Sequence, residues 1–398
     1  MTPLRITIAL LATCVYSQIA VADADLVPVY LDGAGTGFNS NATPHALSTS
    51  HGNPGTTLGE QRRWAFEQAL NYWERRLDSN VPIRVETEMT NLDCDAFGAV
   101  LAAAGPNSVY GNWSAAAGGS AAPVANTWYG EALANRIRNA DLDGGSNDIG
   151  SEFNAQIDAG CLPGFVWYYG LGDAPAGTIS FHRTALHEIA HGLNVLTLVN
   201  LTTGSRFVGA DDIYMTFLHD HSTGKNWKNM SNAERAISAV DSNDLHWVGG
   251  QVTASLGQIS SGKSGGHAQM YAPLPLEGGS SVSHWDTDVD DASGNSELME
   301  PAATGSEKML LTDEMLHDMG WNDVTANNCS FASDRVTVST TNNGTVNNNA
   351  CVALTYDGAT INTGTTTATA GQYIQLQDGF NVQTGATFSA NTDPDIGL

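Results

Sequence analysis

Two histidines four residues apart, with a glutamate beside the first, are the residues of this chain best suited to chemistry. They are His187, Glu188 and His191, in the stretch TALHEIAHGLNVL. Positions i and i+4 of a helix lie on one face, so both imidazoles can bind a single zinc ion. Glu188 can then take a proton from a water molecule that the zinc activates. The spacing predicts the zinc site of a hydrolase.

A catalytic zinc ion needs a third protein ligand, and the residues just after His191 do not supply one. A related pattern, H-E-x-x-H-x-x-G-x-x-H, has a glycine where this chain has Asn194 and a third histidine where it has Thr197. Asparagine tolerates the left-handed turn of that glycine, but threonine cannot replace an imidazole. His284 is the favoured third ligand, because a Gly/Ser-rich segment leads to it and Met299 follows in LMEP, a tight turn.

Other residues compete for the role of third ligand or could bind a metal elsewhere. Asp211 and Asp212 follow about 20 residues after His191 and are the alternative carboxylate ligands. His219 and His221 are expected in an exposed loop, where an H-x-H pair could hold a surface metal. The remaining downstream and flanking histidines are assigned a structural role or none: His182, His246, His267 and His317.

The segments HEIAHGLN, SHWD and LMEP, separated by a long insertion, resemble the leishmanolysin-type metzincins. In those enzymes an inserted segment displaces the third histidine, and a methionine turn follows it. The chain is also similar to secreted bacterial zinc peptidases that end in DxGW, here LHDMGW. The resemblance spans most of residues 27–321 and departs from the usual pattern at Asn194 and Val195, which are not ligands.

The resemblance implies a metzincin-like α+β catalytic domain, with a mixed sheet and a zinc-site helix. It implies a site in which Glu188 is the general base and Met299 lies beneath the metal. The zinc ligands that it implies are His187, His191 and His284.

Hydrophobic spacing predicts the elements that must position this site. Phe66, Ala69, Leu70 and Trp73 recur at helical spacing within residues 59–77, and residues 81–89 alternate as a strand does. A second helix is expected near residues 128–138, a buried strand near Phe165, and the zinc-site helix from about residue 179. Interleaved helices and strands favour an α/β or α+β domain.

The composition changes after Trp321 to Thr, Asn and Gly with short alternating apolar runs. This predicts a small all-β module, residues 326–398, of stacked, solenoid-like units. It resembles the coat-hanger-stack module at the ends of exported bacterial proteins. Surface attachment, polysaccharide binding and export sorting all fit such a module, and nothing in its residues chooses among them.

The N-terminus has the features of a secretory signal peptide, residues 1–22. Arg5 precedes an apolar run, and Ala20-Val21-Ala22 offers a cleavage site. A lipoprotein signal ending at Cys14 is a weaker alternative. The catalytic domain then spans residues 23–325, and secretion is the expected localisation.

The charge of the chain excludes some classes of partner. It has 42 acidic and 16 basic residues and a formal net charge of −26, which is unfavourable for nucleic-acid binding. No later segment has 18 consecutive apolar residues, so stable membrane insertion is not expected. Protein or peptide substrates remain the expected partners.

Four cysteines remain after the signal peptide, an even number that indicates disulfides in an exported chain. Their spacing favours Cys94–Cys161 and Cys329–Cys351, although the other two connectivities stay open. Structural calcium is a further expectation, because three loops are rich in oxygen ligands. These loops are residues 31–39, 141–148 and 286–297.

The sequence therefore predicts a secreted zinc endopeptidase that cleaves peptide bonds with a zinc-activated water. The alternative is a noncatalytic zinc-containing adhesin on the same scaffold. Glu188 favours the enzyme, since a purely structural zinc site has no need of a base.

Overall fold

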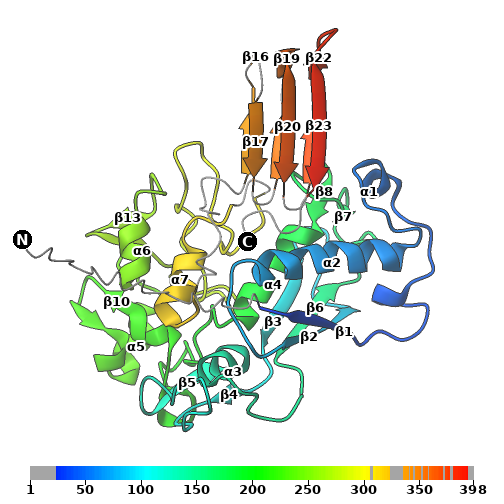
Figure 1. Ribbon diagram of the computed structural model, residues 1–398. Helices are drawn as coiled ribbons and strands as arrows, with labels where there is room; N and C mark the ends of the chain where they lie inside the picture. Colours follow the sequence, from blue (N-terminus) through cyan, green and yellow to red (C-terminus); the bar gives the residue numbers. More distant parts are fainter. Residues whose placement is uncertain are drawn as a thin grey trace, which may run out of the picture.

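The computed structural model is a mixed α+β protein with several sheets (Figure 1). It describes residues 24–304, 308–322, 335–339, 341–343, 346–350, 353–356, 358–370, 373–376 and 380–392. The expected signal peptide and the expected domain boundary at residue 325 lie outside these ranges. The described helices are α1 (Ala46–Ser50), α2 (Leu58–Glu74), α3 (Glu131–Arg138), α4 (Phe181–Gly192), α5 (Asn232–Ser238), α6 (Gly250–Ser255) and α7 (Thr312–Met319).

A four-stranded sheet in the order β1-β2-β6-β3 forms the base of the first half of the chain. Its first three strands are parallel, and β3 pairs antiparallel with β6 at the edge. In β2 the buried residues alternate with more exposed ones, as the sequence predicted. The strands are β1 (Leu26–Tyr30), β2 (Ile83–Thr90), β3 (Ala102–Pro106) and β6 (Ile149–Asn154).

Helices α2 and α4 lie side by side against this sheet (Figure 1). α2 begins with a capping box, in which Thr57 and Glu60 bond each other's backbone N–H groups. Phe66 and Trp73 on its inner face are completely buried, which confirms the predicted amphipathic helix. Phe153 of β6 contacts Phe181, the first residue of α4, with ring centroids 4.6 Å apart. The aromatic core therefore fixes α4 to the sheet.

Antiparallel strands form much of the second half. Five of them make a sheet in the order β11-β10-β12-β14-β13. Two smaller sheets use strands from both halves: β4-β5-β9, in which β4 pairs antiparallel and β9 parallel with β5, and the parallel pair β7-β8. The 3₁₀ helices are η1 (Gly37–Asn39), η2 (Phe207–Gly209), η3 (Tyr214–Phe217) and η4 (Trp227–Asn229). The strands are β4 (Val109–Tyr110), β5 (Thr127–Gly130), β7 (Val166–Tyr168), β8 (Thr178–Ser180), β9 (Asp211–Asp212), β10 (Leu218–Asp220), β11 (Lys225–Asn226), β12 (Leu245–Trp247), β13 (Lys263–Ser264) and β14 (His267–Gln269).

One predicted element begins later than expected. The helix expected from Trp128 begins at Glu131, because Trp128 lies in β5, which pairs with both β4 and β9. Tertiary strand pairing outweighs local helix propensity here. The strand expected near Phe165 is β7; Phe165 itself lies just before it and is exposed, whereas Trp167 and Tyr168 are buried.

A disulfide joins Cys94 to Cys161, with their Cα atoms 5.9 Å apart. This pair was one of the two favoured by spacing, and it is confirmed. Cys329 and Cys351 lie outside the described residues.

The C-terminal strands stack in parallel, as expected for solenoid-like units. Each of three faces is a parallel sheet, β15-β18-β21, β16-β19-β22 or β17-β20-β23. Tyr356, Phe380 and Phe388 contact one another in its core. The strands are β15 (Arg335–Val338), β16 (Thr341–Asn343), β17 (Val346–Ala350), β18 (Ala353–Tyr356), β19 (Thr360–Thr363), β20 (Thr365–Ala370), β21 (Tyr373–Leu376), β22 (Asn381–Val382) and β23 (Thr387–Thr392).

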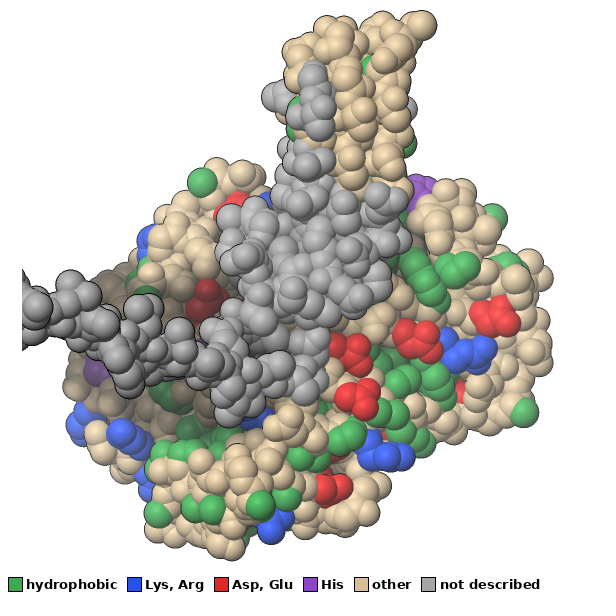
Figure 2. All heavy atoms as spheres, viewed as in Figure 1, with side chains coloured by type: hydrophobic (Ala, Val, Ile, Leu, Met, Phe, Trp, Pro, Cys, Tyr) green, Lys and Arg blue, Asp and Glu red, His purple; other side chains and the backbone are tan. Residues whose placement is uncertain are grey.

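Among the described residues, no helix has the length and apolarity needed to cross a membrane. On the face shown in Figure 2, acidic and basic side chains are interspersed, and the described part shows no continuous basic patch.

Candidate metal centre

Helix α4 carries the first two histidines, and local contacts define where it begins. Ser180 caps it, because the Ser180 hydroxyl accepts a hydrogen bond from the Arg183 N–H. Gly192, in the last turn, lets the helix approach β6 closely. A Cβ at this position would lie 2.3 Å from Ile149 Cγ2, so a larger residue would push α4 off the sheet.

The helix ends in a Schellman motif centred on Asn194. The Asn194 N–H bonds the His191 carbonyl, and the Val195 N–H bonds the Ala190 carbonyl. Asn194 has φ of 100°, in the left-handed region where glycine is the usual residue. Its side-chain oxygen accepts a hydrogen bond from the Gly130 N–H in β5. Asparagine at the glycine position is therefore accommodated by the turn and tied to a neighbouring strand.

Three imidazoles converge at one point, although His284 is 93 residues beyond His191. His284 Nε2 lies 3.0 Å from His187 Nε2 and 3.3 Å from His191 Nε2. His191 and His284 are buried, and His187 is partly exposed. The structure thus brings together the three histidines that the sequence and the resemblance proposed as ligands.

The other ring nitrogen of each histidine faces a backbone carbonyl. His187 Nδ1 lies 2.9 Å from Leu298 O, His191 Nδ1 lies 2.7 Å from Val195 O, and His284 Nδ1 lies 2.7 Å from Ser280 O. A carbonyl can only accept, so each Nδ1 carries the proton and donates it. The three Nε2 lone pairs then point at one another, the arrangement in which metal-binding histidines are oriented by outer partners.

Burial keeps these imidazoles neutral. It lowers the pKa of His187 to about 4 and the pKa of His191 to about 3, the neighbouring His187 adding to the effect at His191. Burial also lowers the pKa of His284 well below its usual value. Neutral imidazole is the form that binds a metal ion, so the three donors are ready at pH 7. The donor set fits zinc, which prefers nitrogen ligands and in catalytic sites takes three from the protein.

Glu188 lies between the helix and the outer strand of the sheet. It is buried, and its carboxylate accepts a hydrogen bond from the backbone N–H of Ala104 in β3. Burial raises the pKa of Glu188 to about 8. A carboxylate whose affinity for a proton is increased in this way is suited to general-base work near neutral pH.

The LMEP segment supports the site through its backbone. The Leu298 carbonyl accepts a hydrogen bond from His187 Nδ1. The next residue, Met299, is completely buried. The Met299 carbonyl accepts from the N–H of Trp285, the residue after His284. The segment that was expected beneath the metal therefore links two of the three histidines.

Glu297, which sequence reasoning treated only as part of an acidic loop, holds this segment in place. Its Oε2 accepts from the Met299 N–H at 2.6 Å. Its Oε1 accepts from the N–H groups of Leu310, Leu311 and Thr312 at 3.0–3.1 Å. The carboxylate thereby ties the methionine turn to the start of α7. Its complete burial is not visible in a sequence.

The carboxylates considered as alternative ligands have other partners. Asp212 accepts hydrogen bonds from the Leu198 and Met215 N–H groups, and Asp211 forms an ion pair with Arg206. They lie outside the group of residues whose donor atoms converge with His187 and His191.

Four other histidines gather on the five-stranded sheet, which the sequence did not indicate. His219 lies within β10 rather than in a loop, opposite His246 of β12. The rings of His221 and His246 stack with centroids 3.8 Å apart, and His221 Nε2 lies 3.1 Å from His267 Nδ1. The expectation of an exposed loop at His219 is wrong, because strand pairing partly buries it. His182 is buried in α4, and His317 lies in α7.

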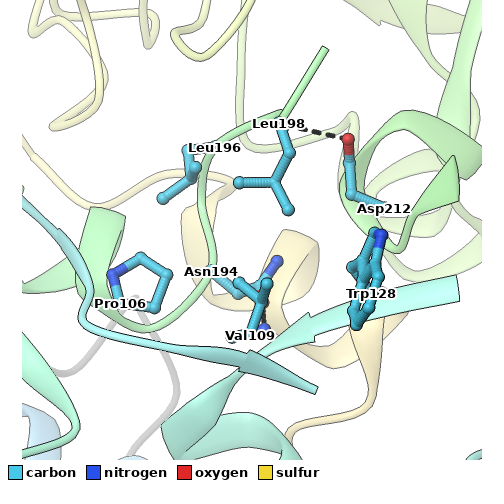
Figure 3. Close-up of a pocket in the computed structure, with 8 residues that line it drawn as sticks. Pro106, Val109, Trp128, Asn194, Leu196, Leu198 and Asp212 are labelled. Carbon is cyan, nitrogen blue, oxygen red and sulfur yellow. Dashed lines mark hydrogen bonds between the residues drawn. The ribbon is translucent and has the colours of Figure 1, made fainter. Parts of the chain in front are cut away.

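A small pocket lies beside the C-terminal end of α4 (Figure 3). Its polar groups already have protein partners: the Leu198 N–H donates to Asp212, and Asn194 accepts from Gly130. The pocket therefore offers a mainly apolar lining. Its residues are Pro106, Val109, Trp128, Gly130, Asn194, Leu196, Leu198 and Asp212.

No family model, curated protein or solved structure matches this chain.

Proposed function

We propose that the protein is a secreted zinc endopeptidase of the metzincin type. The convergence of three Nε2 atoms, each opposite an Nδ1 that donates to a backbone carbonyl, is the observation that carries the proposal. His187, His191 and His284 would hold the ion. Bound zinc would supply a Lewis acid that polarises a peptide carbonyl and acidifies a water molecule.

Glu188, which follows His187 on α4 and has a raised pKa, is the general base in this proposal. It would take a proton from the attacking water and deliver it to the leaving amine. Its contact with Ala104 places it beside β3, the outer strand of the four-stranded sheet. An extended peptide that lay along this edge of the sheet would have its backbone oriented by strand-like hydrogen bonds. This geometry supports a protein or peptide substrate.

The parallel topology of the four-stranded sheet and its single antiparallel edge strand support a zincin-like catalytic domain. The C-terminal solenoid presents short polar strands, which supports attachment to a surface or a polysaccharide rather than catalysis. The signal-like N-terminus supports export.

Glu188→Gln tests the activity. The amide cannot act as a base, so protein hydrolysis should fall on the order of 10²–10⁴-fold. Zinc content, measured by mass spectrometry of the metal, should remain at one ion per chain because no ligand has changed. A chelator should abolish wild-type hydrolysis, and added zinc should restore it. Zinc binding without hydrolysis in the wild type would instead favour a noncatalytic zinc-containing adhesin.

A further inference from the structure

A second group of converging ligand atoms lies outside the zinc site. The carboxylates of Glu131, Asp141 and Asp143 have oxygen atoms that all lie within 4.8 Å of one another. Glu131 is the first residue of α3, and the two aspartates belong to the loop that follows this helix. Sequence reasoning considered that loop as one of three oxygen-rich candidates but did not include Glu131.

Glu131 is the informative member of this group. It is completely buried, and neither carboxylate oxygen has a hydrogen-bond donor in the described structure. The group that contacts it is the carboxylate of Asp143, which is itself an acceptor. A buried carboxylate without a donor is strongly unfavourable unless a proton or a cation compensates it. One of its oxygens lies within 4.8 Å of a carboxylate oxygen of Asp141 and of Asp143.

Hydrogen bonds within the loop after α3 hold the side chains of Asp141 and Asp143 in place. Asp141 Oδ1 accepts from the N–H groups of Asp143 and Gly144, and Asp143 Oδ1 accepts from the Ser146 N–H. Gly144 and Gly145 have φ of 81° and 105°, which allow the chain to turn sharply behind the acids. In the described ranges, no Lys or Arg side chain forms an ion pair with any of the three carboxylates.

We propose that Glu131, Asp141 and Asp143 bind a calcium ion. Carboxylate oxygens are the ligands of a hard cation, and calcium accepts the irregular geometry that a loop and a helix start provide, with waters completing six to eight ligands. Magnesium demands a stricter octahedron, and zinc prefers nitrogen and sulfur. The ion would join α3 to the loop and neutralise the buried carboxylate.

In the other two oxygen-rich loops, no carboxylate is both buried and without a donor among the described residues. In the loop at residues 286–297, the buried Glu297 is saturated with backbone donors, and Asp291 faces Lys308 at 3.3 Å. In the loop at residues 31–39, Asp32 accepts from the N–H groups of Phe38 and Met89. Glu297, Asp291 and Asp32 therefore have donors within the protein, whereas Glu131 has none in the described structure.

The proposal does not depend on peptidase activity, and calcium itself is the probe. Zinc-loaded full-length protein in calcium-depleted buffer is titrated with calcium chloride to about 5 mM by calorimetry, a range set by extracellular calcium modules. We expect one ion per chain at this site and a rise of several degrees in the midpoint of thermal unfolding. The same titration with magnesium should give a response at least about tenfold weaker.

Glu131→Gln and Asp143→Asn should each remove this binding event and the thermal shift. Glu131→Gln removes a buried carboxyl group that must otherwise hold a proton or an uncompensated charge, so in calcium-depleted buffer it should be at least as stable as the wild type. Asp143 is exposed, so Asp143→Asn should fold normally. Asp288→Asn, in the loop at residues 286–297, is the matched control and should bind calcium as the wild type does.

Three results would overturn the proposal. They are no calcium binding to the wild type, an unchanged isotherm in both Glu131→Gln and Asp143→Asn, or loss of binding in Asp288→Asn alone. An equal response to magnesium would overturn the choice of calcium.

Discussion

Asn194 accepts a hydrogen bond from the backbone N–H of Gly130, while its own backbone occupies the left-handed position that ends α4. One residue therefore terminates α4 and attaches its end to β5. The following residue, Val195, supplies the carbonyl that receives His191 Nδ1. The geometry of the turn therefore directly affects the orientation of His191, a proposed metal ligand.

Two substitutions at Asn194 should separate these roles. Asn194→Gly keeps the left-handed backbone but leaves the Gly130 N–H without its acceptor, which should cost roughly 1–2 kcal/mol of unfolding free energy. Asn194→Ala loses the same bond and adds left-handed strain, so it should cost about 1–2 kcal/mol more. Urea unfolding measures both. Equal costs for the two variants would show that backbone strain at this position is unimportant.

His284→Ala should weaken zinc binding by at least about 100-fold, because even outer partners of a zinc ligand contribute 10–100-fold. Competition with a chromogenic zinc chelator measures the affinity. His317→Ala removes a histidine outside the converging triad and is the matched control, so its affinity should equal that of the wild type. Wild-type affinity in His284→Ala would rule out this residue as a ligand.

Glu297→Gln should destabilise the protein by roughly 1–3 kcal/mol. In the wild type, backbone N–H groups donate to both carboxylate oxygens, and in the variant the amide NH₂, itself a donor, would replace one of these acceptors. Urea unfolding checks the cost. Glu152→Gln makes the same chemical change on an exposed part of β6 and should stay within about 0.5 kcal/mol of the wild type. Zinc affinity should also fall in Glu297→Gln, since Met299 and Leu298 are then less firmly held. A neutral result would show that the buried carboxylate is dispensable.

The stability of the calcium-free protein should depend on pH through Glu131. Burial, then the contact with Asp143 and the charges of Asp148 and Asp141, raises its pKa to about 8. Tyr110 of β4 faces the same acids, and its own pKa is raised mainly by burial. Because the folded state binds this proton more tightly than the unfolded state does, stability should fall as the pH rises from about 4.5 to 8.

Urea midpoints at pH 6 and 8.5 measure this fall. Glu131→Gln has no proton to lose, so its midpoint should fall less than that of the wild type over this interval. Other raised groups, such as Glu314, contribute equally to both proteins and cancel in the comparison. Calcium should reduce the wild-type fall, since the ion replaces the proton. Identical pH profiles for the two proteins would contradict the assignment.

The sequence predicted the parts of the fold that depend on local periodicity. The helix around Phe66 and Trp73, the alternating strand from Ile83 and the stacked C-terminal strands all follow from spacing that one face can bury. Trp128 was placed in a helix because local propensity does not reveal a partner such as β9, which is distant in sequence. Burial that depends on long-range packing was missed for the same reason.

In the candidate site too, some residues follow from local spacing and others depend on long-range packing. His187 and His191 follow from helical spacing, and His284 was reached only through neighbouring motifs and the family resemblance. Glu131 and Glu297 were not recognised, because an acidic residue is usually solvated and only the folded chain shows that these two are buried. The cluster around His221 also required strands from separate parts of the chain.

The Nδ1 atoms of the three histidines donate to the backbone carbonyls of Leu298, Val195 and Ser280, so the side chains of these three acceptor residues take no part. The orientation of the ligands is consequently independent of the chemical identity of those three residues. Sequences that differ there can keep the same metal geometry, provided that the path of the main chain is preserved. The geometry of the proposed metal site therefore depends on the path of these loops as well as on the three histidines.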